Sequence, residues 1–347
     1  MTLSKLLGTD FPLIQSPMAG VQGEALALAV SGAGALGSLP CAMLTSEALH
    51  AALVRIEAAT TRPVNVNFFC HRMPEPDAAR DAAWREALSP HYQALGLEPG
   101  TGDSGPVRRP FGPDHADVLE AFRPRVLSFH FGLPAPDLLA RVRRWGSTVL
   151  ASATTVEEAR WLEAQGVDAV IAQGIEAGGH RGMFLSDDLS TQIGTLALLP
   201  QVVRAVRVPV IAAGGIADPA GIRAALALGA SGVQIGTAYL LCNEASTTAL
   251  HREALQCPAA RHTALTNVFS GRPARGIVNH VVRELGPISP LAPAFPLAAA
   301  AMAPLRAAAE AQGSSDYSPL WAGQNASGCR AVPAADLTRG LLSAFSN

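Results

Sequence analysis

Residues 210–220 read VIAAGGIADPA, and they contain a strand, a turn and the start of a helix. The apolar run Val210–Ala213 has the length and composition of a buried strand. After paired glycines, Asp218 precedes Pro219, a pattern typical of a helix N-cap with proline at the first helical position. A glycine ends the expected helix before the next apolar run, Gly232–Thr237. Such a strand, helix, strand unit is typical of a parallel sheet.

The same alternation of apolar runs and helical segments extends over most of the chain. Thr155, for example, is a predicted helix cap with Glu158 three residues later. Eight segments are predicted strands: Pro12–Ala19, Ala35–Leu39, Pro63–Phe69, Val126–Phe131, Thr148–Ala153, Ala169–Gln173, Pro209–Ala213 and Gly232–Thr237. Because eight parallel strands with crossover helices close into a barrel, the sequence predicts an α/β fold of the (β/α)₈ type, a TIM barrel.

Two stretches are additional to a minimal barrel. Residues 71–114 mix proline, glycine and arginine around a predicted helix at Asp77–Leu88, and we interpret them as an insertion after the third strand. Residues 245–324 combine helical periodicity with frequent prolines, which predicts a helical substrate or lid subdomain over the barrel mouth. We therefore expect a barrel of residues 1–244, this helical subdomain, and a C-terminal segment, residues 325–347, that returns to the barrel.

The composition narrows the class of function. The 347 residues include 26 basic and 28 acidic side chains, for a formal net charge of −2, and 16% are charged. An average soluble chain is about 25% charged, so this chain is expected to bury broad apolar surfaces. It has no basic cluster of the kind that binds nucleic acid or an anionic membrane. With no secretory signal pattern and no bilayer-long apolar run, we expect a cytoplasmic monomer or homodimer that acts on small molecules.

Lysine and cysteine usage exclude several kinds of site. Lys5 is the only lysine and lies outside any motif, which excludes a Walker phosphate loop and Schiff-base chemistry. The five cysteines are scattered and show no CxxC or CxxH spacing, so neither a disulfide framework nor a metal site is predicted. Any bound phosphate must then be held by backbone amides, hydroxyls or arginine.

Glycine turns follow the last two predicted barrel strands. Gly214 and Gly215 end the seventh strand, and Gly236 and Thr237 end the eighth. Barrels commonly hold a phosphate on the loops after strands seven and eight, where backbone amides can approach an anion closely. The sequence therefore predicts a phosphate site at these four residues.

Two histidines lie at strand ends, where barrel active sites are built. The sixth strand continues into residues 173–182, QGIEAGGHRG, which place His180 among glycines. An unperturbed imidazole pKa near 6.5 suits proton abstraction at neutral pH, so His180 is the predicted base. His130 ends the fourth strand and is predicted either to line the substrate pocket or to be a hydrogen-bonded core residue.

Two asparagines alternate with valines on the third predicted strand. Asn65 and Asn67 face the same side of that strand. An amide inside a barrel must find hydrogen-bond partners, and its donor and acceptor suit the edge of a heterocycle. Asn67, nearer the strand end, is the predicted ligand contact, while an interior polar network is the alternative for both.

Taken together, six segments resemble the nitronate monooxygenases, formerly called 2-nitropropane dioxygenases. The resemblance extends from about Pro12 to Gln324. The segments are Gln15–Gly20 (QSPMAG), Asn65–Phe68 (NVNF), Gln173–Gly182, Ala213–Ile216 (AGGI), Gln234–Thr237 (QIGT) and Ser318–Gln324 (SPLWAGQ).

The resemblance implies a non-covalently bound flavin mononucleotide (FMN) at the barrel mouth. Its phosphate would lie on Gly214, Gly215, Gly236 and Thr237, with Gln234 nearby. The remaining implied cofactor contacts are Met18, Ala19, Asn67, Gln173 and Gly178. In the family a nitronate reduces the flavin by single-electron transfer, and dioxygen then completes oxidative denitrification to a carbonyl compound and nitrogen oxyanions. The histidine that matches His180 acts there as base or as electrostatic partner.

Two other functions fit such a barrel. One is an FMN-dependent enoyl reductase that uses NAD(P)H on acyl carrier protein thioesters. The other, from a different class, is a barrel that binds a phosphorylated metabolite without redox chemistry. Flavin content and the identity of the electron donor distinguish these functions from oxidation of a nitronate by dioxygen.

One departure from the family concerns the substrate pocket. Members that act on small acidic nitronates such as propionate 3-nitronate carry Tyr, Tyr and Lys four residues apart, where this chain has Phe295, Ala299 and Ala303. Residues four apart share a helix face, so this wall of the pocket is expected to be apolar. The departure argues against propionate 3-nitronate as the substrate and leaves larger or more apolar nitronates, or another flavin reaction, open.

Overall fold

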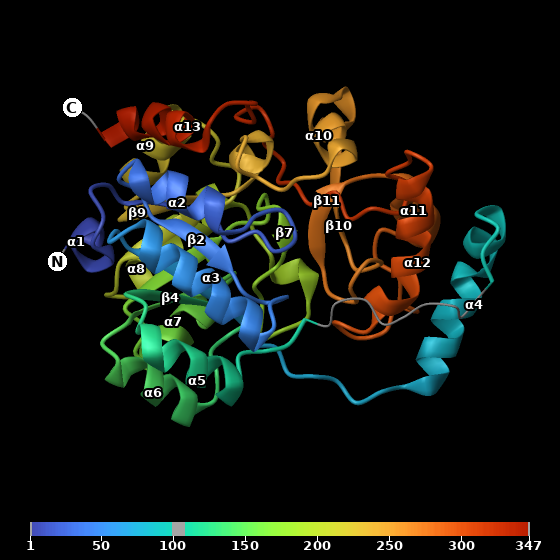
Figure 1. Cartoon of the computed structure of the whole chain (residues 1–347), viewed down its shortest axis with the longest axis horizontal. Coiled ribbons are helices and arrows are strands. Elements are labelled where there is room, and N and C mark those ends of the chain that lie inside the picture. The colour runs from blue at the N-terminus through green and yellow to red at the C-terminus, as the bar shows by residue number, and fades with distance from the viewer. Residues whose placement is uncertain (1, 99–107, 346–347) are drawn as a thin grey trace.

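The computed structural model describes residues 2–98 and 108–345, and a barrel of eight parallel strands forms its centre (Figure 1). The strands are β1 (Leu13–Gln15), β2 (Gly37–Pro40), β3 (Val64–Phe69), β4 (Val126–His130), β5 (Thr148–Ala153), β6 (Ala169–Gln173), β8 (Val210–Ala213) and β9 (Gly232–Ile235). They pair in the order β1-β9-β8-β6-β5-β4-β3-β2. The Gln15 N–H donates to the Leu36 carbonyl at 2.8 Å and the Leu36 N–H to the Leu13 carbonyl at 2.9 Å, which closes the circle. The predicted TIM barrel is confirmed.

The first strand is shorter than the predicted Pro12–Ala19. Pro17 has no N–H to donate to a sheet, and the chain leaves the barrel wall just before it. The Met18 N–H donates instead to the side-chain oxygen of Gln22 at 3.1 Å. The segment after β1 therefore turns across the barrel mouth rather than continuing the strand.

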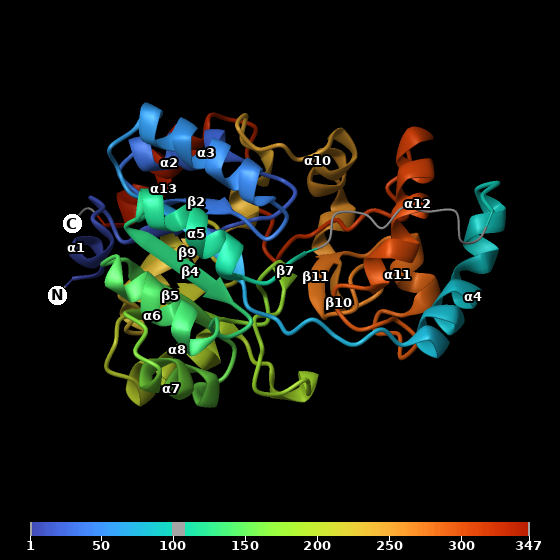
Figure 2. The same ribbon diagram turned by 60° about the horizontal axis from the view of Figure 1, so that its bottom comes forward.

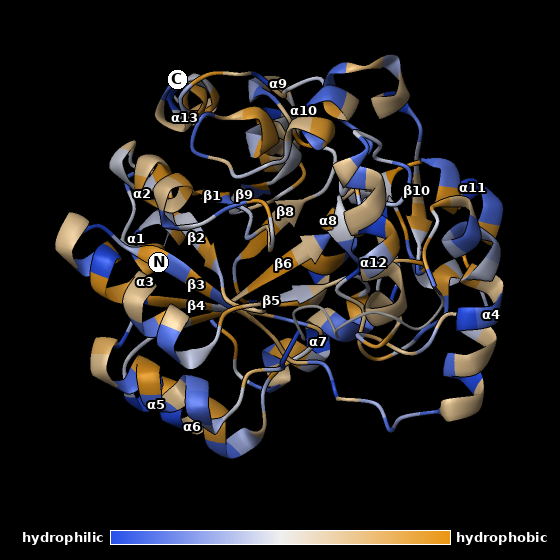
Figure 3. Ribbon diagram, turned by 45° about the vertical axis from the view of Figure 1, so that its right-hand side comes forward, coloured by the Kyte–Doolittle hydropathy of each residue, from blue (hydrophilic) through white to orange (hydrophobic). Residues whose placement is uncertain are grey.

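Helices surround the barrel, and Figure 3 shows apolar strands inside a ring of helices with mixed polarity. They are α2 (Glu24–Gly32), α3 (Ser46–Ala59), α5 (Pro113–Phe122), α6 (Pro136–Arg144), α7 (Val156–Ala164), α8 (Thr195–Ala205) and α9 (Pro219–Ala227). Helix α1 (Leu3–Leu7) contributes Leu3 and Leu7 to an apolar cluster with Ile14. The C-terminal α13 (Ala334–Leu342) packs against α2 and α9.

The two predicted helix caps are present, with one difference. Asp218 accepts the Gly221 N–H at 2.8 Å at the start of α9. Thr155 accepts the Glu158 N–H at 3.2 Å, but the Glu158 carboxylate bonds to the N–H and hydroxyl of Thr154 at 2.6 and 2.8 Å. Glu158 therefore secures the end of β5 instead of completing a reciprocal capping box.

An outer layer lies to one side of the barrel (Figures 1 and 2). It contains α10 (Ala249–Gln256), α11 (His280–Leu285), α12 (Ala298–Ala311) and a three-stranded antiparallel sheet, β10-β11-β7. Its strands are β10 (Thr263–Thr266), β11 (Ala274–Ile277) and β7 (Gly179–His180). The helical periodicity of residues 245–324 did not predict this sheet, because strands of two to four residues are too short to show an alternating pattern.

Helix α4 (Ala78–Ala94), within the predicted insertion, belongs to the outer layer. It is longer than the expected Asp77–Leu88, and its Trp84 and Leu88 share an apolar cluster with Met302 of α12. Residues 99–107 of the insertion lie outside the described residues. Four 3₁₀ helices complete the described structure: η1 (Leu189–Thr191), η2 (Thr237–Leu241), η3 (Pro258–Arg261) and η4 (Ser343–Phe345). Among the described helices, none has the length and hydropathy to cross a bilayer.

Candidate active site

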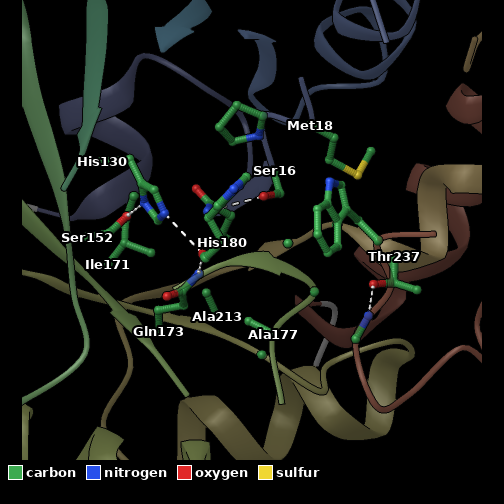
Figure 4. A pocket seen from close by; sticks show the side chains of 18 of the residues that line it. Ser16, Met18, His130, Ser152, Ile171, Gln173, Ala177, His180, Ala213 and Thr237 are labelled. Atoms are coloured by element: carbon green, nitrogen blue, oxygen red, sulfur yellow. Dashed lines mark hydrogen bonds between the residues drawn. The ribbon is translucent and has the colours of Figure 1, made fainter. Parts of the chain in front are cut away.

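A cavity that is partly open to solvent lies at the C-terminal ends of the barrel strands. Both predicted histidines and every residue expected to contact a cofactor line it: Met18, Ala19, Asn67, His130, Gln173, Gly178, His180, Gly214, Gly215, Gln234, Gly236 and Thr237. The barrel thus brings together strand ends that are far apart in the sequence (Figure 4).

Two glycine turns form one wall of the cavity. Gly214 and Gly215 have φ angles of 121° and 71°, which glycine adopts without the strain that a side chain would cause. Gly236 begins the second turn, and the Thr237 hydroxyl accepts the Gly323 N–H at 2.9 Å. This wall therefore presents backbone groups and one hydroxyl to the cavity.

Gln234 carries a buried polar atom that lacks a partner. Its amide nitrogen lies 3.4 Å from the Ser16 hydroxyl, while its Oε1 makes no hydrogen bond with any described residue. A buried acceptor without a donor costs roughly 1–3 kcal/mol, so this atom is suited to a donor from a bound molecule.

Gln173 and Asn67 are already engaged with the protein. The Gln173 amide donates to the His180 carbonyl at 3.1 Å, and its oxygen accepts the Gly182 N–H at 2.8 Å. The Asn67 amide nitrogen donates to the Ser128 hydroxyl at 2.9 Å. Gln173 therefore fixes the loop that carries His180, in addition to lining the cavity.

His180 lies on β7 and pairs with Ala274 of β11, so its backbone belongs to the outer layer's sheet. Its Nε2 lies 2.9 Å from the Ser270 hydroxyl, and that hydroxyl donates to the Arg272 carbonyl at 3.3 Å. Because the Ser270 hydroxyl donates its proton to the Arg272 carbonyl, we assign the His180 Nε2–H as the donor to the Ser270 oxygen. The unprotonated nitrogen of His180 is then Nδ1.

The surroundings of His180 disfavour its charged form. Burial is the largest cause of a pKa well below 6.5, followed by the charges of Arg108 and Arg272 and by the neighbouring imidazoles of His130 and His71, which disfavour a further proton at this site. Part of the side chain still faces the cavity. His180 is therefore a neutral imidazole at pH 7, and its base strength is lower than that of an ordinary histidine.

His130 supports the strand on which His180 lies. Its Nε2 donates to the His180 carbonyl at 3.1 Å, and its Nδ1 accepts from the Ser152 hydroxyl at 3.0 Å (Figure 4). Burial, only partly opposed by the bond to His180, lowers its pKa to about 4. His130 therefore lines the cavity and is also hydrogen-bonded on both ring nitrogens. Its place in a substrate pocket stays a prediction.

The predicted substrate wall is only partly at the site. The Phe295 ring centroid lies 5.2 Å from the His180 ring and 4.7 Å from the His71 ring. Phe295 itself is buried, Ala299 and Ala303 are half-buried on α12, and none of the three is among the described residues that line the cavity. Of the three positions, Phe295 alone contacts the predicted base.

Several side chains at the site were not predicted. Arg181 is fully buried and donates to the carbonyls of Gln173 and Gly174, each at 2.7 Å. Ser270 lies 90 positions from His180, and no sequence pattern connects them. Arg108, from the insertion, and Trp321, from the SPLWAGQ segment, also line the cavity.

The described residues contain no group of three histidine, cysteine, aspartate or glutamate side chains arranged to hold a metal ion. The polar side chains that line the cavity carry imidazoles, amides, hydroxyls, the Arg108 guanidinium and the Glu176 carboxylate, set against aromatic rings and glycine turns.

Comparisons with known proteins agree over nearly the whole chain. The nitronate monooxygenase family model matches residues 1–343. Nitronate monooxygenases of Paraburkholderia phytofirmans and Pseudomonas aeruginosa are each 45% identical, over 98% of this chain and 93% and 97% of those proteins. A nitroalkane oxidase from Streptomyces ansochromogenes superimposes with a TM-score of 0.89 at 40% identity, covering 99% of this chain and 97% of that one. FabK from Thermotoga maritima superimposes with 0.73 at 26% identity, covering 99% and 96%. The chain therefore belongs to the nitronate monooxygenase family of oxidoreductases.

Proposed function

We propose that this protein uses non-covalently bound FMN to oxidise alkyl nitronates with dioxygen, giving a carbonyl compound and nitrite. The observation that carries the proposal is the cavity itself, which joins two glycine turns on one wall to a neutral imidazole at position 180. When bound, FMN supplies the redox chemistry by accepting electrons from the nitronate and passing them to dioxygen.

The residues of the cavity fit this cofactor. The backbone amides of Gly214, Gly215 and Gly236 would hold its phosphate together with the Thr237 hydroxyl, because the site offers no lysine. The unpartnered Gln234 Oε1 offers an acceptor to the same molecule. The other expected contacts, at Met18, Ala19, Asn67, Gln173 and Gly178, lie around the same cavity.

The low basicity of His180 favours nitronates over neutral nitroalkanes. A nitroalkane must lose a proton before it can be oxidised, and His180 Nδ1 is the atom we assign to accept it. Proton abstraction is most efficient when the pKa of the base is near the working pH, whereas that of His180 is well below 6.5. A nitronate is already deprotonated and avoids this step. We therefore expect turnover of nitronates to exceed turnover of nitroalkanes.

The test combines cofactor analysis with turnover. The purified protein should be yellow and release FMN on denaturation, and anaerobic addition of an alkyl nitronate should bleach the flavin. In air, the same substrate should consume oxygen and yield nitrite. A colourless protein that cannot be reconstituted with FMN would instead support a barrel that binds a phosphorylated metabolite.

An enoyl reductase is the second candidate, favoured by the similarity to FabK at 26% identity. Such an enzyme requires NAD(P)H. Rapid anaerobic reduction of the flavin by NAD(P)H, with no reduction by nitronate, would support this candidate and overturn the proposed one.

A further inference from the structure

Several buried arginines surround the His180 loop, and most of them hold backbone. Arg181 donates to the Gly174 carbonyl at 2.7 Å, and Arg275 donates to the Ile175 carbonyl at 2.8 Å. Arg272 donates to the Met183 carbonyl, and its guanidinium carbon lies 4.1 Å from the centroid of the Phe131 ring. These three cations are engaged in fixing the loop.

Arg108 has a different environment. It lines the cavity together with His180 and Phe69. Among the described residues it forms no ion pair, whereas the adjacent Arg109 pairs on the surface with Asp114 at 3.6 Å. Of the charges that act on His180, that of Arg108 has the largest effect. Its guanidinium is therefore a cation close to the proposed base.

The cavity has little negative charge to neutralise this cation. Glu176 is the one carboxylate among the described lining residues. Its oxygens accept the Thr195 N–H at 2.9 Å and the Thr195 hydroxyl at 2.8 Å, which ties Glu176 to the start of α8. Since His180 and His130 are neutral, Arg108 gives the side of the cavity near His180 a net positive charge.

We infer that Arg108 binds the anionic oxygens of the nitronate substrate and selects this anion over the neutral nitroalkane. The inference rests on the proposed function. A nitronate carries its negative charge on two oxygens in one plane, as a carboxylate does, and the guanidinium fork matches such a pair with two parallel hydrogen bonds.

This assignment changes the expectation drawn from Phe295, Ala299 and Ala303. Those three positions do not line the cavity, whereas Arg108, from the insertion after β3, lines it and supplies a cation. The apolar surface of Phe69 and Trp321, which line the same cavity, then remains for the alkyl part of the substrate.

Arg108→Gln tests the inference, with Arg108→Lys as the conservative variant and Arg109→Gln as the matched control. Oxygen consumption is measured with nitroethane and with its preformed nitronate. Arg108→Gln should lower kcat/KM for the nitronate by about 10- to 100-fold, mainly through KM, which is the effect of one hydrogen bond to a charged group. Nitroethane turnover should not fall and should rise if proton abstraction limits it, because the change removes a charge that lowers the pKa of His180. Arg108→Lys should recover part of the nitronate loss, and Arg109→Gln should match the parent.

Nitrate is a planar, unreactive anion and gives a readout that does not depend on turnover. Calorimetric titration of the purified protein with nitrate, at constant ionic strength, should show tenfold or more weaker binding in Arg108→Gln than in the parent or Arg109→Gln, on the order of a lost charged hydrogen bond. Equal nitrate affinity in all three proteins would overturn the inference, as would equal losses with both substrates. If the parent failed to oxidise nitronates, the proposed function would be wrong, and the nitrate titration would still decide the role of Arg108.

Discussion

Replacing Ser270 with alanine tests how the protein fixes the orientation and the tautomer of the His180 ring. The Ser270 hydroxyl accepts from His180 Nε2 at 2.9 Å and donates to the Arg272 carbonyl at 3.3 Å. Ser270→Ala leaves a buried N–H without a partner, which should lower the free energy of unfolding by roughly 1–3 kcal/mol. It also removes the bond that holds the ring and keeps the proton on Nε2, so Nδ1 loses its fixed role as acceptor. We expect nitroalkane turnover to fall by about 10- to 100-fold, the effect of a small misplacement of a reacting group.

Ser147→Ala is the matched control for this experiment. Ser147 is also a buried serine, and its hydroxyl donates to the Pro124 carbonyl at 2.6 Å just before β5, at the opposite end of the barrel. Both variants should lose stability in urea unfolding, but Ser147→Ala should retain parental turnover. The assay is oxygen consumption with nitroethane from pH 5 to 8, together with FMN content. If Ser270→Ala kept the parental rate and pH profile with full flavin, the tautomer assigned to His180 would be wrong.

Three further predictions follow from the same site. His180→Asn should keep the flavin but lose most turnover of nitroethane relative to its nitronate, and equal losses in oxygen uptake would contradict its role as base. Gly178→Ala would place a Cβ 2.5 Å from the Gly323 nitrogen, so it should destabilise the protein by about 1–3 kcal/mol in thermal unfolding and cause loss of FMN. Its control is Gly340→Ala on α13, where a Cβ would meet open space and stability should be unchanged or increased. The folded pKa of His130 is about 4 against 6.5 unfolded, so the unfolded state binds more protons between these values and stability falls as the pH is lowered. Urea unfolding should show a loss on the order of 2–3 kcal/mol from this group between pH 7 and 4.5, and a parent curve as flat as that of His130→Gln would refute it.

The sequence predicted the barrel because its signals are local. A glycine or a helix cap follows β4, β5, β6, β8 and β9, and β5 and β6 begin and end at the predicted residues. Site residues at strand ends could also be predicted from the sequence, because barrel topology brings those ends to one mouth. His180, Gly214 and Gly236 could therefore be placed together before the structure was known.

The supporting contacts could not be predicted, because they join residues that no period or motif connects. Ser270 reaches His180 through the pairing of β7 with β11, and this pairing depends on strands too short to leave a pattern. From the sequence, Arg108 could be recognised only as one of the arginines in the predicted insertion, residues 71–114. Its place beside His180 has no local signature in the sequence.

The pairing of β7 with β11 has a consequence for how substrate enters. The chain reaches His180 from β6 of the barrel through a loop. The backbone of His180 itself pairs with β11 of the outer layer. An outward movement of the outer layer would therefore displace the His180 imidazole as well. The cavity could not be opened in this way while His180 kept its catalytic position. We therefore expect substrate and product to pass through the existing opening of the cavity during turnover, while the outer layer stays in place.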